Sequence, residues 1–367
     1  MIYLDHGATS MGKPPQVARA MADAVAQCGN PGRGGHSAAM AGARAVFRCR
    51  SLAAEMFHCP EEQVIFTTSC THGVNIALRS LIKPGSRVVI SGFEHNAVTR
   101  TLHALGAQMI VAGRRLFDRE DTLCAFERAL REGADAAVFT HVSNVFGYIL
   151  PIEEISRLCR RYGVPFVIDG AQSAGILPLD MEKLGADFIA MPGHKGLLGP
   201  QGTGLLLCGR NPAPLLFGGT GTDSRSQDMP QQLPEGLEAG TLNVPGIAGL
   251  GAALNWLQTQ DGGTIARREA STAKYCAEGL RAMGISVFAG PDQSGTVSFV
   301  TKRDCEEVAA GLAQRGIAVR AGLHCAPLAH ESAGTLESGT VRVSFGHDAS
   351  KAQVRQLLHA LKVMDVM

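Results

Sequence analysis

The sequence lacks an excess of charge of either sign. Its 367 residues contain 34 Lys and Arg against 33 Asp and Glu, which gives a formal net charge of +1, and the basic residues form no stripe. Proteins that bind nucleic acid usually carry a basic patch as their electrostatic footprint. We therefore expect no nucleic-acid partner, and expect small molecules or protein surfaces instead.

Long apolar runs are absent as well. No window of about 18 apolar residues occurs, which is roughly the length needed to cross a bilayer. The first residues, "MIYLDHGATSMGKPP", do not combine a positively charged start with an apolar run. The sequence therefore predicts a soluble cytoplasmic protein without a membrane partner.

The cysteines lack any paired spacing. Ten of them are scattered singly from Cys28 to Cys325, with no CxxC and no zinc-like pattern. A disulfide framework is typical of short secreted chains with regular cysteine spacing, and this chain is neither short nor regular. We expect free thiols, mostly buried, and no metal site.

What the sequence does contain is an alternation of strand-like and helix-like segments, which is typical of an α/β fold with a mainly parallel sheet. The strand candidates of the first part are "QVIF", "RVVIS", "QMIVA", "AAVFT", "PFVID", "DFIAM" and "GLLLC". Helices are expected over 71–81, 96–105 and 152–162, and the segment 218–236 is expected to be a loop.

Two domains are expected, because single hydrophobic cores stop growing near roughly 250–300 residues. After about residue 255 the pattern of predicted elements changes. Strands are expected at "ISVFA", "GTVSFV" and "TVRVSF", and helices over 306–315 and 352–361. We predict a large α/β domain over 15–255 and a smaller α+β domain formed by 1–14 and 256–367.

Reactive side chains follow several of the predicted strands. In an open α/β sheet, ligands bind beyond the carboxyl ends of the strands. His95 follows "RVVIS", Asn144 follows "AAVFT", Asp169 and Gln172 follow "PFVI", and Lys195 with His194 follows "DFIAM". "TTSCTHGVN", after "QVIF", leads into a helix whose first N–H groups suit a phosphate.

This set is what pyridoxal 5'-phosphate requires. A lysine amine forms an imine with the cofactor aldehyde, a carboxylate pairs with the ring nitrogen, and a helix N-terminus holds the phosphate. An imidazole facing the ring can stack on it and move protons. Each residue alone has an ordinary structural explanation, since a lone Lys after a strand is usually a solvated loop residue and a lone Asp there is often a helix N-cap. Their joint occurrence at strand ends favours the functional explanation.

At this point a family resemblance emerges over essentially the whole chain. The motifs are "YLDHGAT", "NPGRGGH", "FTTSCTHGVN", "EHNAV", "HVSNVFG", "DGAQS", "GHKGLLGPQGTG", "EAGTLN", "RAGLHCAP" and "VRVSF". The chain resembles the class V aminotransferase-fold enzymes, and most of all the cysteine desulfurase and selenocysteine lyase group with a short nucleophile loop. The resemblance implies a pyridoxal-phosphate-dependent transferase of fold type I, working as a homodimer.

The resemblance also implies roles for individual residues. Lys195 would carry the cofactor, His95 would stack on its ring and act in catalysis, Asp169 would pair with the ring nitrogen, and Gln172 would reach the phenolic oxygen. The phosphate would be held by Thr71, His72 and His194 together with Thr241 of a second subunit. Asn144 would lie near both cofactor and substrate, and Arg342 would bind the substrate carboxylate, with Arg320 and His324 nearby.

Cys325 stands where the family keeps its nucleophile. The resemblance implies that its thiolate attacks the sulfur of L-cysteine, which releases L-alanine and leaves a persulfide for an acceptor protein or a small thiol. His324 and Arg320 are expected to favour the thiolate. The alternative interpretation of Cys325 is a buried, inert structural thiol, which is what we expect of the other nine cysteines.

Three departures from the family pattern leave substrate preference open: Pro192 in place of a hydroxyl, Leu323 in place of a second histidine, and His6 in "YLDHGAT". Selenocysteine lyase activity is one alternative to desulfuration. A different pyridoxal-phosphate reaction, such as transamination or epimerisation, is another. A third is a sulfur-relay scaffold without turnover, which the presence of Lys195 and Asp169 disfavours.

Overall fold

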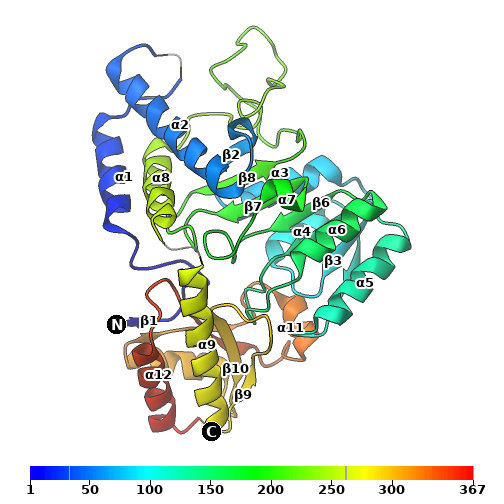
Figure 1. Ribbon diagram of the computed structural model, residues 1–367, viewed down its shortest axis with the longest axis vertical. Helices are drawn as coiled ribbons and strands as arrows, with labels where there is room; N and C mark the ends of the chain where they lie inside the picture. The colour runs from blue at the N-terminus through cyan, green and yellow to red at the C-terminus, as the bar shows by residue number, and fades with distance from the viewer. Residues whose placement is uncertain (33, 261–262, 367) are drawn as a thin grey trace.

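A computed structural model describes residues 1–32, 34–260 and 263–366 of the chain. Residue Arg33 of the "NPGRGGH" motif lies outside this part. Figure 1 shows two lobes, with the larger sheet and its helices in the upper one and both ends of the chain in the lower one. In the described ranges, no helix is both long enough and apolar enough to cross a bilayer.

The upper lobe is built around a seven-stranded sheet in the order β2-β8-β7-β6-β5-β3-β4. The strands are β2 (Val64–Thr67), β3 (Arg87–Ser91), β4 (Gln108–Ala112), β5 (Ala136–Thr140), β6 (Phe166–Asp169), β7 (Phe188–Pro192) and β8 (Gly204–Cys208). Neighbours pair in parallel from β7 to β4, whereas β8 is antiparallel to both β2 and β7. The predicted mainly parallel sheet is confirmed, and β8 is the one reversed strand.

Both faces of this sheet are covered. Val64 and Phe66 of β2 belong to one hydrophobic cluster, whereas Ile65 between them belongs to another. A sheet buried on both faces requires continuous apolar strands, which is why these segments read as unbroken apolar runs. The covering helices are α1 (Pro15–Gln27), α2 (Ser37–Phe57), α3 (Cys70–Leu81), α4 (Asn96–Ala104), α5 (Arg119–Arg131), α6 (Ile152–Tyr162), α7 (Met181–Leu184) and α8 (Val244–Gln258), and a 3-10 turn, η1, spans Glu61–Gln63.

Local sequence signals explain where α6 begins and ends. Pro151 precedes its first residue, and Gly163 follows its last residue in the left-handed conformation, with φ of 65°. Glycine adopts that conformation without the steric cost that a Cβ brings. The predicted helix over 152–162 is therefore confirmed to the residue, and the segment 218–236 contains no helix or strand, as expected.

The lower lobe is an α+β unit. It contains β1 (Ile2–Tyr3), α9 (Thr264–Ala282), β9 (Ser286–Phe288), β10 (Thr296–Val300), α10 (Cys305–Gln314), β11 (Ile317–Ala318), β12 (Arg320–Gly322), α11 (Pro327–Ala333), β13 (Thr340–Ser344) and α12 (Lys351–Val363). The order β12-β13-β10-β9 forms an antiparallel sheet, and β1 pairs with β11. The short strands β1, β11 and β12 carry no clear alternation and were not predicted.

The cores of the two lobes are separate. One cluster joins Leu4 to apolar residues between Ala273 and Val366. Ala326 and Ala329, at the start of α11, pack instead in the cluster of the large lobe, and α11 lies at the boundary between the lobes in Figure 1. The division into 15–255 and 1–14 with 256–367 remains a prediction, which these clusters support.

Candidate active site

The carboxyl ends of the central strands bring the predicted reactive residues to one edge of the sheet. Asp169 is the last residue of β6 and is paired with Thr140 of β5 and Ala190 of β7. Lys195 follows β7 by three residues, and His95 follows β3. Because these strands are parallel, the segments that leave them start side by side.

Lys195 lies in a turn whose glycines the backbone requires. A Cβ at Gly193 would lie 2.1 Å from Oγ1 of Thr203, and one at Gly196 would lie 2.4 Å from the carbonyl oxygen of Ala174. The pKa of Lys195 is lowered, chiefly by burial, while Cys70 and Asp169 act in the opposite direction. A lowered amine pKa increases the fraction of free base, which is the form that attacks carbonyl carbon.

Asp169 is almost fully buried and is held on one side only. Its Oδ1 accepts the N–H of Ala171 at 2.8 Å and the thiol of Cys70 at 3.4 Å. Within the described residues, nothing donates to Oδ2. Burial and the Asp169 carboxylate raise the pKa of Cys70 well above its ordinary value, so Cys70 is a neutral thiol that donates. The free oxygen is therefore available to a cationic or N–H group of a ligand.

His95 is the N-cap of α4, and its ring orientation is set by the backbone. Nδ1 accepts the N–H of Ala97 at 3.0 Å, which leaves the ring proton on Nε2. Burial lowers the pKa of His95 despite the opposing charge of Asp169. The side chain is therefore a neutral imidazole with a defined tautomer.

The N-terminus of α3 provides a second feature of this edge. Ser69 caps the helix by accepting the N–H of His72 at 3.2 Å. The N–H groups of Cys70 and Thr71 precede the first intrahelical bond, so they point out of the helix end. Such groups, with the helix dipole, favour an anion. Thr71 is exposed, and His72 is half-buried.

Arg342 of β13 is buried against an acid from the other end of the chain. Its Nη2 donates to Oδ1 of Asp5 at 2.8 Å, and its Nη1 donates to the carbonyl oxygen of Asn144 at 2.9 Å. Arg320 binds the same Asp5 through Nε and Nη2. These two cations and one anion carry a net positive charge, which suits a carboxylate ligand.

Cys325 is exposed and lies in a tightly held loop between β12 and α11. His324 and Cys325 both have left-handed backbone conformations, with φ of 50° and 57°. The N–H of Asn96 donates to the carbonyl oxygen of Cys325 at 2.7 Å, and Nδ2 of Asn144 donates to that of His324 at 2.8 Å. Two non-glycine residues in this conformation are costly, so these bonds fix where the thiol lies.

His324 does not act as a cationic neighbour of this thiol. Its ring is buried, and Nε2 lies 3.2 Å from the carbonyl oxygen and 3.1 Å from the hydroxyl of Thr340. Burial, with the charge of Arg342, lowers the pKa of His324 to about 2. His324 is therefore a polar but uncharged neighbour of the thiol, and its effect on the thiolate stays a prediction. Arg320 is the cation that can favour the Cys325 thiolate. Its pKa is raised mainly by the hydrogen bond to Asp5 and to a smaller extent by Cys325.

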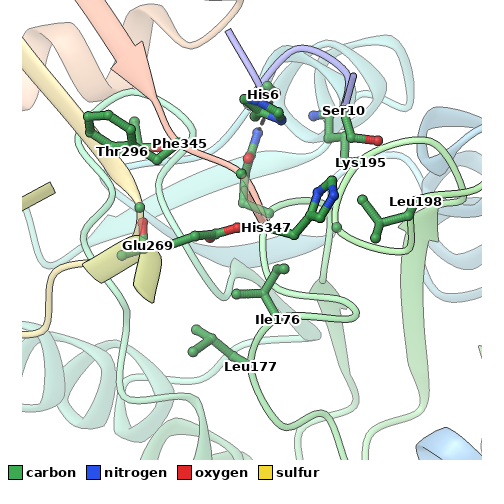
Figure 2. A pocket seen from close by; sticks show the side chains of 16 residues that line it. His6, Ser10, Ile176, Leu177, Lys195, Leu198, Glu269, Thr296, Phe345 and His347 are labelled. Carbon is green, nitrogen blue, oxygen red and sulfur yellow. Dashed lines mark hydrogen bonds between the residues drawn. The ribbon is translucent and has the colours of Figure 1, made fainter. Parts of the chain in front are cut away.

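A pocket adjoins Lys195 on the side of the small domain (Figure 2). Gln172 lines it, and its Nε2 donates to the carbonyl oxygen of Gly7 at 3.0 Å. Glu269 of α9 points into the pocket toward His347 and is only 7% exposed. None of the residues that the structure describes donates a hydrogen bond to it, and burial raises the pKa of Glu269 to about 8, with a further contribution from Asp348.

Comparison with known proteins identifies the protein family of this chain. The model for class-V aminotransferases matches residues 2–357. The chain belongs to this family. A probable cysteine desulfurase from Methanothermobacter thermautotrophicus is 30% identical to it, with 98% of this chain and 94% of the relative covered. Another from Haemophilus influenzae is 31% identical, with 100% and 86% covered.

Solved structures lead to the same class-V group. The apo structure of the cysteine desulfurase from Thermococcus onnurineus NA1 superposes with a TM-score of 0.90 at 30% identity and covers 99% of this chain and 94% of its own. The cysteine desulfurase CsdA from Escherichia coli gives 0.88 at 27% identity, with 100% and 95% covered. The predicted fold, the large α/β and small α+β arrangement of fold type I, is confirmed.

Most of the residues predicted from this class-V pattern lie together, and one does not. Those at the carboxyl edge of the large sheet, in the segments and the first turn of α3 that follow it, or on the part of the small lobe that faces it are Thr71, His72, His95, Asn144, Asp169, Gln172, His194, Lys195, Arg320, His324, Cys325 and Arg342. Thr241 is exposed in the segment before α8 and makes no hydrogen bond within the described chain. It would take part only if a second subunit approached.

Two residues of the site were missed at the sequence level. Asp5 lies in the quoted "YLDHGAT" motif, but its pairing with Arg342 spans almost the whole chain and leaves no local signal. Cys70 was grouped with the buried structural thiols, although its position at the first turn of α3, directly after a strand, was a usable signal that it borders the site.

Proposed function

We propose that the protein is a pyridoxal-phosphate-dependent cysteine desulfurase that converts L-cysteine to L-alanine and forms a persulfide on Cys325. Relatives and structural neighbours that carry this name support the proposal. The observation that carries it is the exposed Cys325 thiol, held in a fixed loop by the residue that follows His95 and by Asn144. The buried Lys195 amine, close enough to Asp169 to be affected by its charge, disfavours a scaffold without turnover.

The residues present fit the cofactor. Asp169 offers Oδ2 to a protonated ring nitrogen, since the described residues donate only to its Oδ1. The N-terminus of α3 with Thr71 and His72 suits a phosphate, and His194 would join them. Pro192, buried at the end of β7, supplies no hydroxyl there. Lys195 would carry the cofactor, Gln172 would donate to its phenolic oxygen, and His95 would stack on its ring.

When bound, the cofactor supplies an electron sink that accepts the electron pair left when the substrate loses its α-proton. The chain's own residues do the rest. Arg342, with Arg320 and Asp5 behind it, binds the substrate carboxylate and so fixes the substrate next to Lys195. Lys195, with its lowered pKa, accepts the α-proton.

Sulfur transfer follows from the position of Cys325. Its thiolate attacks the substrate sulfur, an S–S bond forms, and the Cβ–S bond breaks with its electron pair on carbon. A proton then reaches Cβ, and Lys195 returns the α-proton to Cα, which gives alanine, while the persulfide stays on Cys325. Because that thiol is exposed, an acceptor protein or small thiol can reach it without unfolding the loop.

We also propose a homodimer. Thr241 is exposed and remote in sequence from α3, and a second subunit would bring it to the neighbour's phosphate site. This part of the proposal rests on the family resemblance and on the exposure of Thr241.

The experiment that tests the function is turnover by the purified, cofactor-loaded protein with cysteine and with selenocysteine in separate reactions. Alanine formed from cysteine, together with sulfide when a reducing thiol is present, is the expected result. Alanine from selenocysteine alone would make the protein a lyase, and alanine from neither would overturn the proposal.

A further inference from the structure

The carbonyl oxygen of His194, the residue before Lys195, is surrounded by donors from one N-terminal segment. The N–H of Ser10 donates to it at 3.0 Å, and the hydroxyl of Ser10 also donates at 3.0 Å. Nζ of Lys13 lies 3.3 Å from the same oxygen and donates to the Ser10 hydroxyl at 2.8 Å. A carbonyl oxygen has two lone pairs, so Ser10 and Lys13 satisfy it without further help. Figure 2 shows Ser10 and Lys195 on the same wall of the pocket.

Thr9 stands between two acceptors with a single proton to give. Its Oγ1 lies 3.2 Å from the carbonyl oxygen of His194 and 3.0 Å from Nδ1 of the same residue. A hydroxyl has one O–H. If that proton goes to the carbonyl, Nδ1 must carry the ring proton and donate to Thr9, which leaves Nε2 bare. If it goes to Nδ1, the ring proton lies on Nε2.

The surroundings decide between these two arrangements. The carbonyl already has its donors, so the Thr9 proton is needed only at Nδ1. The imidazole is neutral, because burial, Lys195 and Lys13 lower the pKa of His194 to about 4. It therefore has one ring proton, which must be placed on one nitrogen or the other. Tyr3 fixes the Thr9 backbone by donating from Oη to its carbonyl oxygen at 2.9 Å.

We propose that Thr9 is a positioning residue that holds His194 in the tautomer with the proton on Nε2, the tautomer that donates to a phosphate oxygen. This inference rests on the proposed cofactor site and adds to it the group that sets the direction of one phosphate hydrogen bond. Lys13 and Ser10 serve the same purpose indirectly, because they free the Thr9 hydroxyl from the carbonyl. A phosphate oxygen has no proton to give at this bond, so the other tautomer would present two lone pairs to each other.

The test uses the full-length protein with ¹⁵N-labelled histidine. Nitrogen shifts of His194, assigned with a His194→Gln sample, report which ring nitrogen carries the proton, with pyridoxal phosphate and with inorganic phosphate as probes. The wild type should show a protonated Nε2 and a bare Nδ1. Thr9→Ser should keep this pattern, and Thr9→Val should lose it.

Cofactor affinity supplies a second readout. Thr9→Val should weaken binding of pyridoxal phosphate roughly tenfold, the effect of one hydrogen bond to a charged group, while Thr9→Ser stays within about twofold. Thr272→Val is the matched control, since it removes a buried hydroxyl whose hydrogen bond among the described residues goes to the backbone of α9. It should change neither the tautomer nor the affinity.

These outcomes test the cofactor site and the role of Thr9 separately. A wild type that does not bind pyridoxal phosphate overturns the cofactor site, while the tautomer measured with inorganic phosphate still tests Thr9. A protonated Nδ1 in the wild type, or a Thr9→Val variant with unchanged tautomer and affinity, overturns the role of Thr9.

Discussion

Asp5 and Arg342 form a buried ion pair across 337 positions of sequence, with Nη2 of Arg342 2.8 Å from Oδ1 of Asp5. Both side chains are nearly excluded from water. The pair joins the loop after β1 to β13, and Nε of Arg342 has no partner among the described residues. The direction in which this guanidinium points is therefore set by the Asp5 carboxylate together with the carbonyl oxygen of Asn144.

Asp5→Asn should weaken substrate binding and the fold together. It keeps an acceptor but removes the charge, so the free energy of unfolding should fall by about 1–3 kcal/mol, and the KM for cysteine should rise more than kcat falls. Urea unfolding and steady-state kinetics measure the two effects. Arg320→Met is the matched control, because Arg320 is half-exposed and its pair should contribute less. Equal effects of the two changes would contradict this account of Arg342.

Two buried carboxyl groups should make stability fall as pH rises from about 6.5 to 8. Below that range, buried histidines with lowered pKa values, such as His141 and His194, make stability rise with pH. Burial raises the pKa of Glu94 and of Glu269 to about 8 from 4.5. A carboxyl whose pKa is higher in the folded state binds its proton preferentially there. Its stabilising contribution is complete below pH 4.5 and is lost as pH rises through 8. Each group should lower the free energy of unfolding by about 1.4 kcal/mol per pH unit in that window.

Glu94→Gln and Glu269→Gln should flatten this dependence, since an amide imitates the protonated acid. The measurement is denaturant unfolding between pH 6.5 and pH 8, where the buried histidines are largely neutral in both the folded and the unfolded chain. Glu278→Gln, an exposed carboxyl on the same helix α9, should leave the slope unchanged. A wild-type stability that rises with pH across the window would show that neither carboxyl holds its proton in the fold.

Much of the fold could be predicted from the sequence, for a physical reason. Strands of a sheet covered on both faces are continuous apolar runs, so β3, β5 and β8 were located to the residue, as was the partly exposed edge strand β4. The positions after parallel strands meet at one edge, which is why the order of the strands and the residues that follow them was enough to group Asp169 with Lys195.

The remaining features depend on tertiary contacts that leave no local pattern. His324 looks like a potential cation in the sequence, but its burial beside Arg342 keeps it neutral. Glu269 reads as a surface residue of a polar helix, yet it faces the pocket between the lobes.

Borohydride reduction should attach the cofactor to Lys195. The turn after β7 places this amine at the edge that also carries Asp169, and its lowered pKa favours the reactive free base. The purified protein should be yellow, and Lys195→Ala should lose the label while keeping its fold by circular dichroism. Peptide mass spectrometry identifies the lysine. A pyridoxyl group found on Lys13, the half-buried lysine near His194, would show that Lys195 is not the residue that carries the cofactor.

Subunit mixing should reveal whether Thr241 serves its neighbour. Lys195→Ala and Thr241→Glu should each be inactive alone, the second because it brings a carboxylate beside the phosphate. A heterodimer of the two has one intact site if Thr241 acts across the interface, so activity should return on co-expression. Ser224→Glu, in the same exposed segment, is the control and should be active by itself. No recovery in a purified heterodimer would place Thr241 outside the neighbour's site.

The most direct test of the central claim follows the sulfur. Wild type and Cys325→Ala, at matched cofactor occupancy, are incubated with L-cysteine; alanine is quantified, and the persulfide is located by mass spectrometry of alkylated peptides. The account predicts alanine with an added sulfur on Cys325 in the wild type. It predicts near-complete loss of alanine from cysteine in Cys325→Ala, with much of the turnover of selenocysteine retained, because selenium can leave without attack by a thiolate. Undiminished cysteine turnover by Cys325→Ala, or a persulfide on another cysteine, would contradict it.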